Sequence, residues 1–365
     1  MKNRIVFLLP QAALQPIGGF KVVFEYANRL VRDGLNVTLV YPNTLKNPEK
    51  KTRTLLKDIT RYIIRKINKD YTPKRWFNLN KRIEQIYSWT LDSFTYHKND
   101  LIIATAVNTA IILNQYKIDS KNKFYLIQGY ENWFVSEDLL ISTYHYPFKK
   151  IVISTWLQDI LQKHGEHSIL IPNGFDFNFF KCSRKISERN PYNIAYMYHV
   201  DKIKGVNIAM KAFHIVKQNY PELKVTMFSA YDKPSDLPEW MDFHQKPDKA
   251  LFNKIYNDAA IYVGSSHVEG WGLTIGEAMQ CGCAIACTNN KGYLEMAKDG
   301  ETALVSPVGD AKKLAENIAR LISDSELRCR IAEQGHEFIQ QFDVEKSYLK
   351  LKKIMEESWM SPSSL

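Results

Sequence analysis

The first 42 residues alternate between two hydrophobic patterns. Short, nearly continuous apolar runs at residues 4–10 and 36–41 predict buried β-strands. Between them, residues 20–31 carry apolar side chains at a helical spacing, and the segment closes at Asp33-Gly34. Gly18-Gly19 ends the loop before this helix. Strand, glycine turn, helix and strand, in this order, predict the start of a doubly wound α/β domain.

The same alternation continues to the end of the chain. Further strands are predicted at residues 101–105, 123–127, 150–154, 168–171, 193–198, 223–228, 241–244, 260–263 and 283–287, with helical patterns between most of them and at 311–322, 327–342 and 344–359. Pro172-Asn173-Gly174 interrupts the series, because proline cannot continue a strand and Asn-Gly turns sharply. At 365 residues the chain is longer than one hydrophobic core usually grows, so we expect two domains with a boundary at residue 172.

The stretch from Ser265 to Met279 reads as a strand end, a tight turn and a helix. Gly270 and Gly272 bracket Trp271, and the helix that follows from Leu273 has free N–H groups in its first turn, which suit a phosphate. Glu269 and Glu277 flank the turn, and a carboxylate can accept hydrogen bonds from two adjacent sugar hydroxyls. The alternative is that Glu277 lies on a solvated helix face and the glycines only turn the chain.

Two other segments suit an anion. Lys204 stands just before Gly205 and a predicted helix at 206–217, so it is placed for a pyrophosphate, although a lone loop lysine is more often simply solvated. Gly18-Gly19 could cradle a phosphate or form a plain loop.

The net charge of +10 is concentrated in one segment. Residues 46–82 hold thirteen Lys and Arg side chains against three acidic ones, so the remainder of the chain is close to neutral. Within this segment Leu56, Ile59, Ile63 and Ile67 form an apolar stripe. A cationic amphipathic helix predicts contact with an anionic membrane, and the candidate contacts are Lys57, Arg61, Arg65, Lys66, Lys74, Arg75 and Trp76. The alternative is a domain helix with its stripe on the core. No DNA- or RNA-binding motif accompanies the charge, so we expect no nucleic acid.

Other features narrow the class of protein. No apolar run is long enough for a membrane span, and the apolar start of the chain is too short for a signal peptide. The five cysteines lack zinc-ligand spacing, and Cys281-Gly-Cys283 lies in an apolar stretch that predicts buried thiols. We therefore expect a reducing cytoplasm and no structural metal.

The run Glu269-Gly-Trp-Gly-Leu-Thr-Ile-Gly-Glu-Ala-Met-Gln-Cys-Gly282 closely resembles the signature of retaining, family-4 glycosyltransferases with the GT-B fold. Pro172-Asn173-Gly174-Phe175-Asp176 resembles their hinge. The resemblance implies two Rossmann-like doubly wound domains facing each other across a cleft. These are an acceptor domain at 1–172 and a nucleotide-sugar domain at 173–341, and a C-terminal helix at 342–365 crosses back to the first domain. It also implies metal-independent transfer, without a cofactor, from a UDP-sugar or dTDP-rhamnose to a lipid-linked or growing surface glycan.

The resemblance assigns roles to individual residues. Lys204, Glu269 and His199, which stands where the family has an arginine, are the catalytic candidates. His199 would act on the leaving phosphate as a cation or as a neutral donor. The donor-site candidates are Gly18, Gly19, Gly270, Trp271, Gly272, Leu273, Thr274 and Glu277. Gln128 stands where members often have a histidine, and Gln128, Tyr130 and Glu131 are candidate acceptor or sugar contacts.

Two other functions remain open on this reading. One is a nucleotide-sugar epimerase of the same fold, and the other is a membrane- or polyanion-binding protein with a degenerate donor site. We expect a cytoplasmic protein that is peripheral on the inner face of the plasma membrane.

Overall fold

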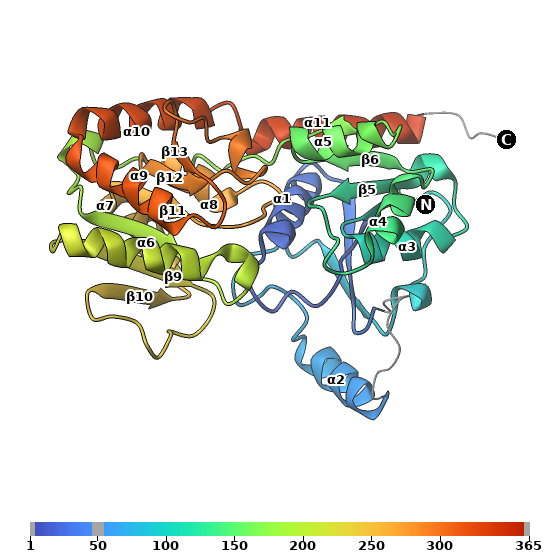
Figure 1. Ribbon diagram of the computed structural model, residues 1–365. Coiled ribbons are helices and arrows are strands. Elements are labelled where there is room, and N and C mark those ends of the chain that lie inside the picture. The colour runs from blue at the N-terminus through green and yellow to red at the C-terminus, as the bar shows by residue number, and fades with distance from the viewer. Residues whose placement is uncertain (1–3, 46–54, 361–365) are drawn as a thin grey trace. The chain divides into compact units, whose positions relative to one another are not determined.

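A computed structural model of the chain describes residues 4–45 and 55–360 (Figure 1). It divides into two compact units, Met1–Pro172 with Glu345–Leu365, and Asn173–Val344. Both units are α/β, as predicted, and each contains one parallel sheet with helices around it. Lys46, Lys50, Lys51 and Arg53 of the basic segment lie outside the described residues.

The first domain is built on a seven-stranded parallel sheet in the order β3-β2-β1-β4-β5-β6-β7. The order reverses between β1 and β4, so the loops that follow these two strands diverge at the carboxyl edge of the sheet, where α/β proteins bind ligands. The strands are β1 Arg4–Leu8, β2 Asn36–Pro42, β3 Glu84–Ser88, β4 Leu101–Ala104, β5 Lys123–Ile127, β6 Lys149–Val152 and β7 Ile169–Leu170.

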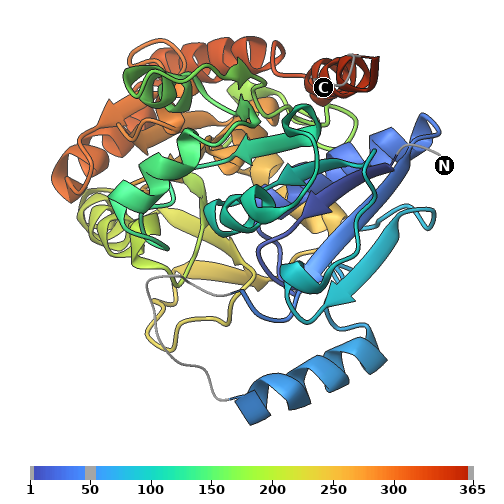
Figure 2. The same cartoon turned by 90° about the vertical axis from the view of Figure 1, so that its right-hand side faces the viewer.

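The helices of this domain are α1 Gly18–Arg32, α2 Leu55–Asn68, α3 Val107–Gln115, α4 Glu137–Tyr144, α5 Thr155–Lys163 and α11 Val344–Met360. The last of them is fastened to α1 by polar contacts. Tyr348 and Lys352 donate to Asp33 Oδ2 at 2.6 and 2.7 Å, and Arg32 donates to Glu345 at 3.0 Å. In both views α2 stands at the margin of the domain, away from the sheet (Figures 1 and 2).

The second domain is built on a six-stranded parallel sheet in the order β10-β9-β8-β11-β12-β13, which reverses between β8 and β11. The strands are β8 Asn193–Met197, β9 Lys224–Ser229, β10 Met241–Gln245, β11 Ile261–Gly264, β12 Ala284–Thr288 and β13 Leu304–Ser306. The helices are α6 Val206–Asn219, α7 Lys249–Asp258, α8 Leu273–Gln280, α9 Ala311–Ser323 and α10 Ser325–Ile339. One apolar core joins the sheet to α6, α9 and α10.

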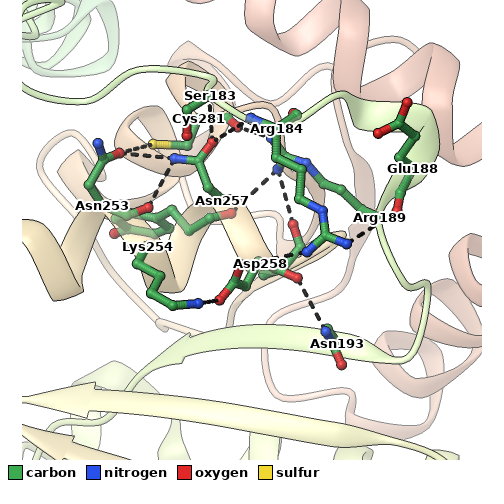
Figure 3. A network of polar contacts seen from close by, with 12 residues as sticks. Ser183, Arg184, Glu188, Arg189, Asn193, Asn253, Lys254, Asn257, Asp258 and Cys281 are labelled. Carbon is green, nitrogen blue, oxygen red and sulfur yellow. Dashed lines mark hydrogen bonds and ion pairs between the residues drawn. The ribbon is translucent and has the colours of Figure 1, made fainter.

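A polar network anchors the segment that enters this domain (Figure 3). The Arg189 guanidinium is buried and donates to the carbonyl oxygens of Ala259, at 3.1 Å, and Cys281. Asn257 accepts the Ser183 N–H at 2.7 Å. The network lies at the amino ends of the strands, away from the switch-point loops. Burial raises the pKa of the neighbouring Cys283 thiol to about 12, and Cys281 and Cys283 are both buried, as predicted, whereas Cys182 and Cys329 are partly exposed.

The sequence patterns missed three elements. Glu84–Ser88 is half polar and Leu304–Ser306 is very short, so neither shows a clear strand pattern. Helix α4 has only a weak apolar face, but its N-cap Ser136 accepts the Leu139 N–H at 3.4 Å.

Helix α1 begins at Gly18, two residues earlier than predicted, so Gly18 and Gly19 form its first turn. No helix within the described ranges is long and apolar enough to cross a membrane.

Candidate active site

The loops after β8 and β11, the two strands at the switch point of the second sheet, are held together through their backbones. Ser265 Oγ donates to the Lys204 carbonyl at 2.9 Å, and the His267 N–H donates to the Ile203 carbonyl at 2.7 Å. Gly205 makes this approach possible. Its φ is +63°, and a Cβ there would lie 2.0 Å from the Ser265 carbonyl oxygen. Only glycine fits at this position.

The contact between the loops brings Lys204 and Glu269 together. Lys204 Nζ lies 2.7 Å from Glu269 Oε1, and Ser266 Oγ donates to the same oxygen at 2.8 Å. The two side chains are 23% and 15% exposed, so the pair is largely enclosed but still reaches solvent. The sequence indicated both residues separately, and the structure adds that they form one ion pair.

Helix α8 begins beside this pair. Gly272 is its N-cap, with φ of +99°, and a Cβ there would lie 2.6 Å from the ring of Tyr293. The amides of Leu273 and Thr274 stand in the first turn, where N–H groups have no acceptor within a helix, so this end suits a phosphate. Gly270 lies in the preceding turn. Tyr293 was not predicted, although it also donates to Ser266 Oγ at 3.0 Å.

The side chain of Trp271 belongs to the core of the second domain. It is 2% exposed and packs edge-on against Phe342, with ring centroids 5.1 Å apart. The sequence does not show which residue an aromatic ring between two glycines packs against, so a ligand contact was predicted. In the structure, only the backbone of Trp271 is left for a ligand.

Glu277 does not lie on a solvated face. It is 4% exposed, and Tyr256 Oη donates to Glu277 Oε2 at 3.3 Å. This burial rules out the alternative of a carboxylate on a solvated helix face. A buried carboxylate needs hydrogen-bond partners, and Tyr256 supplies one. The predicted contact of Glu277 with ribose hydroxyls stays a prediction.

His199 is held as a neutral ring. Its Nδ1 accepts the Asp201 N–H at 2.9 Å, which places the ring proton on Nε2, and the ring packs edge-on against Tyr231. Burial, followed by the nearby Lys204 cation, lowers the pKa of His199. Of the two roles predicted for it, the geometry favours a neutral hydrogen-bond donor. Among residues 4–45 and 55–360, no three His, Cys, Asp or Glu side chains gather as metal ligands would.

The second domain is similar to a known protein family. Residues 180–338, most of the second domain, match the family described as "Glycosyl transferases group 1". The chain is 25% identical over 183 residues to the capsular polysaccharide biosynthesis glycosyltransferase CapM of Staphylococcus aureus, covering 46% of this chain and 48% of CapM. It is 24% identical over 336 residues to the uncharacterized glycosyltransferase MJ1178 of Methanocaldococcus jannaschii, covering 77% and 92%.

A solved structure extends the likeness to the whole fold. The Anabaena protein Alr3699/HepE, in complex with UDP-glucose, superposes with a TM-score of 0.71 at 17% identity over 97% of this chain and 99% of that one. Residues 180–338 are thus similar to the group 1 glycosyl transferases. The fold of the chain is the two-domain GT-B fold that the signature implied. The chain spans only about half of CapM, so the activity of the whole glycosyltransferase is treated below as a proposal.

The first domain brings several other predicted residues together. A Cβ on Gly19 would lie 3.2 Å from Gln128 Nε2, so these two positions touch. Glu131 Oε2 accepts the Val107 N–H at 2.6 Å, and burial raises the pKa of Glu131 to about 7. Tyr130 donates to Glu137 instead, and burial, then Glu137, raises the pKa of Tyr130 to about 12.

The stripe of α2 is not packed on the core. Leu56, Ile63 and Ile67 are 78%, 50% and 74% exposed, which contradicts the alternative of a core-packed domain helix. Lys57, Lys66 and Lys74 are exposed, and Arg75 pairs with Asp70 at 3.2 Å.

Trp76 also takes part in the packing of the first domain, and its predicted membrane contact stays a prediction. Its indole N–H donates to the Ala13 carbonyl at 2.9 Å, and its ring lies 5.6 Å from that of Phe24.

Proposed function

We propose that the chain transfers a sugar from a nucleotide-diphosphate donor to a hydroxyl group, with retention of anomeric configuration and without a metal ion. The observation that carries the proposal is the placement of Lys204, Glu269 and the start of α8 at one switch point. Bond cleavage places charge on the departing diphosphate. A fixed cation and helix N–H groups stabilise such charge best in a site that excludes water.

Each side chain takes a distinct part in this scheme. Lys204 and the amides of Leu273 and Thr274 bind the diphosphate, and His199 donates from Nε2. Glu269 accepts from Lys204 before the donor arrives and holds the lysine at the site. Glu277 binds the ribose hydroxyls.

The donor we propose first is a UDP-sugar, because the structure of HepE holds UDP-glucose, and dTDP-rhamnose is the second choice. The acceptor is a hydroxyl of a lipid-linked or growing surface glycan, in keeping with the role in capsular polysaccharide biosynthesis for which CapM is named. The exposed face of α2, with Lys57 and Lys66, contacts the anionic inner face of the plasma membrane.

The test is a thermal-shift panel of nucleotide sugars, measured in EDTA. At a concentration a hundred times its Kd, the true donor should stabilise the folded state by about 2.7 kcal/mol. NMR of the product with a glycan acceptor should show the anomeric configuration of the donor. Protection only after Mg²⁺ is added would remove metal independence, and no protection by any nucleotide sugar would leave the degenerate-site alternative. Conversion of the donor sugar without an acceptor would indicate the epimerase.

A further inference from the structure

The loop that begins at the end of β12 packs against the turn that carries Ser266 and Glu269. Thr288 Oγ1 and Asn290 Nδ2 both donate to the Ser266 carbonyl, at 2.6 and 3.0 Å. A Cβ on Gly292 would lie 2.4 Å from the Glu269 carbonyl oxygen, so this backbone contact leaves no room for a side chain. A third loop of the second domain therefore supports the Lys204–Glu269 pair from behind.

Tyr293 is the side chain of this loop that reaches furthest into the turn. It is 2% exposed, and a Cβ on Gly264 or Gly272 would lie 2.9 or 2.6 Å from its ring. The ring is therefore held between the end of β11 and the start of α8. Its hydroxyl donates to Ser266 Oγ at 3.0 Å. Tyr293 thus contacts both parts of the turn without being open to a ligand.

The chemistry of the groups fixes the direction of the hydrogen bonds. The Glu269 carboxylate, paired with Lys204, can only accept, so Ser266 Oγ donates to it at 2.8 Å. Ser266 Oγ in turn accepts from Tyr293. A hydroxyl that accepts a hydrogen bond becomes a stronger donor, and the effect is larger where water is excluded. Tyr293 therefore strengthens the bond that Ser266 makes to the carboxylate.

Lys204 and Ser266 both donate to the same oxygen, Glu269 Oε1, at 2.7 and 2.8 Å. When a diphosphate takes Lys204, as proposed above, Ser266 is the described side chain that still donates to the carboxylate. Glu269 is only 15% exposed, so without a donor its charge would draw Lys204 back. The bond from Ser266 therefore matters most after the lysine has left.

We propose that Tyr293 is a positioning residue of the donor site. Acting through Ser266, it holds the Glu269 carboxylate in place and hydrogen-bonded, so that Lys204 can leave it for the diphosphate. The inference rests on the proposed function and deepens it, because it names the group that sets how readily the ion pair opens. Burial keeps Tyr293 itself from touching the donor.

The experiment measures the affinity of the full chain for UDP, with dTDP as a second probe, by isothermal titration calorimetry in EDTA. Tyr293→Phe removes the hydroxyl but keeps the ring against Gly264 and Gly272. It should weaken UDP binding by about threefold, because Ser266 then donates less strongly. Ser266→Ala removes the donor itself and should weaken binding by about tenfold.

Tyr196→Phe is the matched control. Tyr196 is also 2% exposed, and its hydroxyl lies 2.9 Å from Ser265 Oγ, so the same kind of buried bond is lost from the same domain. This second chain ends on the Lys204 carbonyl and not on a carboxylate. Both tyrosine variants should lower the melting temperature alike, but Tyr196→Phe should bind UDP as the wild type does. Equal losses of UDP affinity would overturn the proposal, because lost stability would then explain both.

Double variants test the route of the effect. In a Ser266→Ala background, Tyr293→Phe should cause no further loss of UDP affinity. In a Glu269→Gln background it should also have no effect, since there is no ion pair to open. Additive losses in either background would show that Tyr293 acts by another route, which contradicts the proposal.

Kinetics with the identified donor give a second readout. Tyr293→Phe should raise KM for the donor by about threefold and leave kcat unchanged, because Lys204 has left Glu269 in both the bound complex and the transition state. A merely structural role would lower kcat through the folded fraction. Wild-type affinity in both Tyr293→Phe and Ser266→Ala would remove this inference and leave the proposed function standing. Failure of the wild-type chain to bind UDP or dTDP would remove both.

Discussion

The switch points of the two sheets are built in opposite ways. Between β8 and β11 the loops close on each other, and Lys204 and Glu269 satisfy one another at 2.7 Å. Between β1 and β4 the loops leave a cavity of about 480 Å³ that is lined by Glu131, Arg61 and Arg65. The same position in the fold therefore holds a fixed ion pair in one domain and an open polar cavity in the other. Fold alone does not decide what a switch point binds.

The two switch points also differ in how their positive charges are balanced. In the second domain the cation has a carboxylate partner, so any anionic ligand competes with Glu269 for Lys204. In the first domain Arg61 and Arg65 face a carboxyl group whose pKa is raised to about 7, so the cationic side dominates. The first arrangement suits a doubly charged diphosphate that can displace an ion pair. The second leaves two cations in the wall of an open polar cavity.

The largest expected effect is on the closed site. Lys204→Ala should lower the rate of sugar transfer by about a hundredfold or more, because loss of one preorganised charge-stabilising group in an active site has that cost. The rate is measured with the donor that the thermal-shift panel identifies. Circular dichroism and the melting temperature show whether the variant remains folded.

Lys202→Ala is the matched control for this prediction. Lys202 belongs to the same short turn but is exposed and is not part of the Lys204–Glu269 ion pair, so its removal should change the rate by less than about twofold. Transfer at the wild-type rate by Lys204→Ala would show that the closed pair is structural. The contrast between the two switch points would then lose its functional meaning.

The second prediction concerns the close approach that builds this site. Gly205→Ala places a Cβ 2.0 Å from a backbone oxygen at a positive φ, so strain and overlap add. We expect the second domain to lose about 3 kcal/mol of stability, a fall of roughly 8 °C in its melting temperature.

Gly300→Ala separates the two causes. Gly300 has φ of +74° in the same domain, but a Cβ there meets nothing within 4 Å, so only the conformational strain remains. Its melting temperature should fall by roughly 3 °C. If the two variants melt alike, the contact at Ser265 is not tight, and the closed character of this switch point is overstated.

The closed site was largely predictable because its parts are local in sequence. Strand end, glycines, helix start and both carboxylates fall within residues 261–280, and the family signature covers the same run. What could not be predicted is long-range. The Lys204–Glu269 pair joins residues 65 positions apart, and Trp271 is buried by Phe342, a partner that no local pattern reveals.

The open site was predicted only in fragments, because its walls come from four loops and a separate helix. Glu131 was a candidate because it lies in a loop that follows a strand. Asn108 lies at the start of a helix, and nothing in the sequence distinguishes it from other polar residues. Arg61 and Arg65 were assigned to a membrane face because helical spacing shows which residues share a face but not what that face meets. Only the order of the strands in the sheet could have indicated this cavity, because it brings the loops after β1, β2, β4 and β5 to one edge.

The smallest expected effect tests the electrostatics of the open site through Glu131. Its pKa is about 7 in the folded chain and ordinarily 4.5, so between these values the unfolded chain releases a proton that the folded chain keeps. Rising pH therefore favours the unfolded state across this window, and the loss is complete above pH 7. Gln cannot ionise, so Glu131→Gln should be more stable than wild type at pH 8, by about 1–3 kcal/mol, and equally stable at pH 4.5.

The measurement is the difference in melting temperature between variant and wild type at both pH values, which cancels the titration of all other groups. Asp138→Asn serves as the control, because that carboxylate is exposed and should show no such pH-dependent gain. A gain of equal size at pH 4.5 and pH 8 would mean that packing, not charge, causes the effect. The carboxyl of Glu131 would then be ionised in the folded chain and would partly cancel the charge of Arg61 and Arg65, so the two switch points would differ less in their electrostatics.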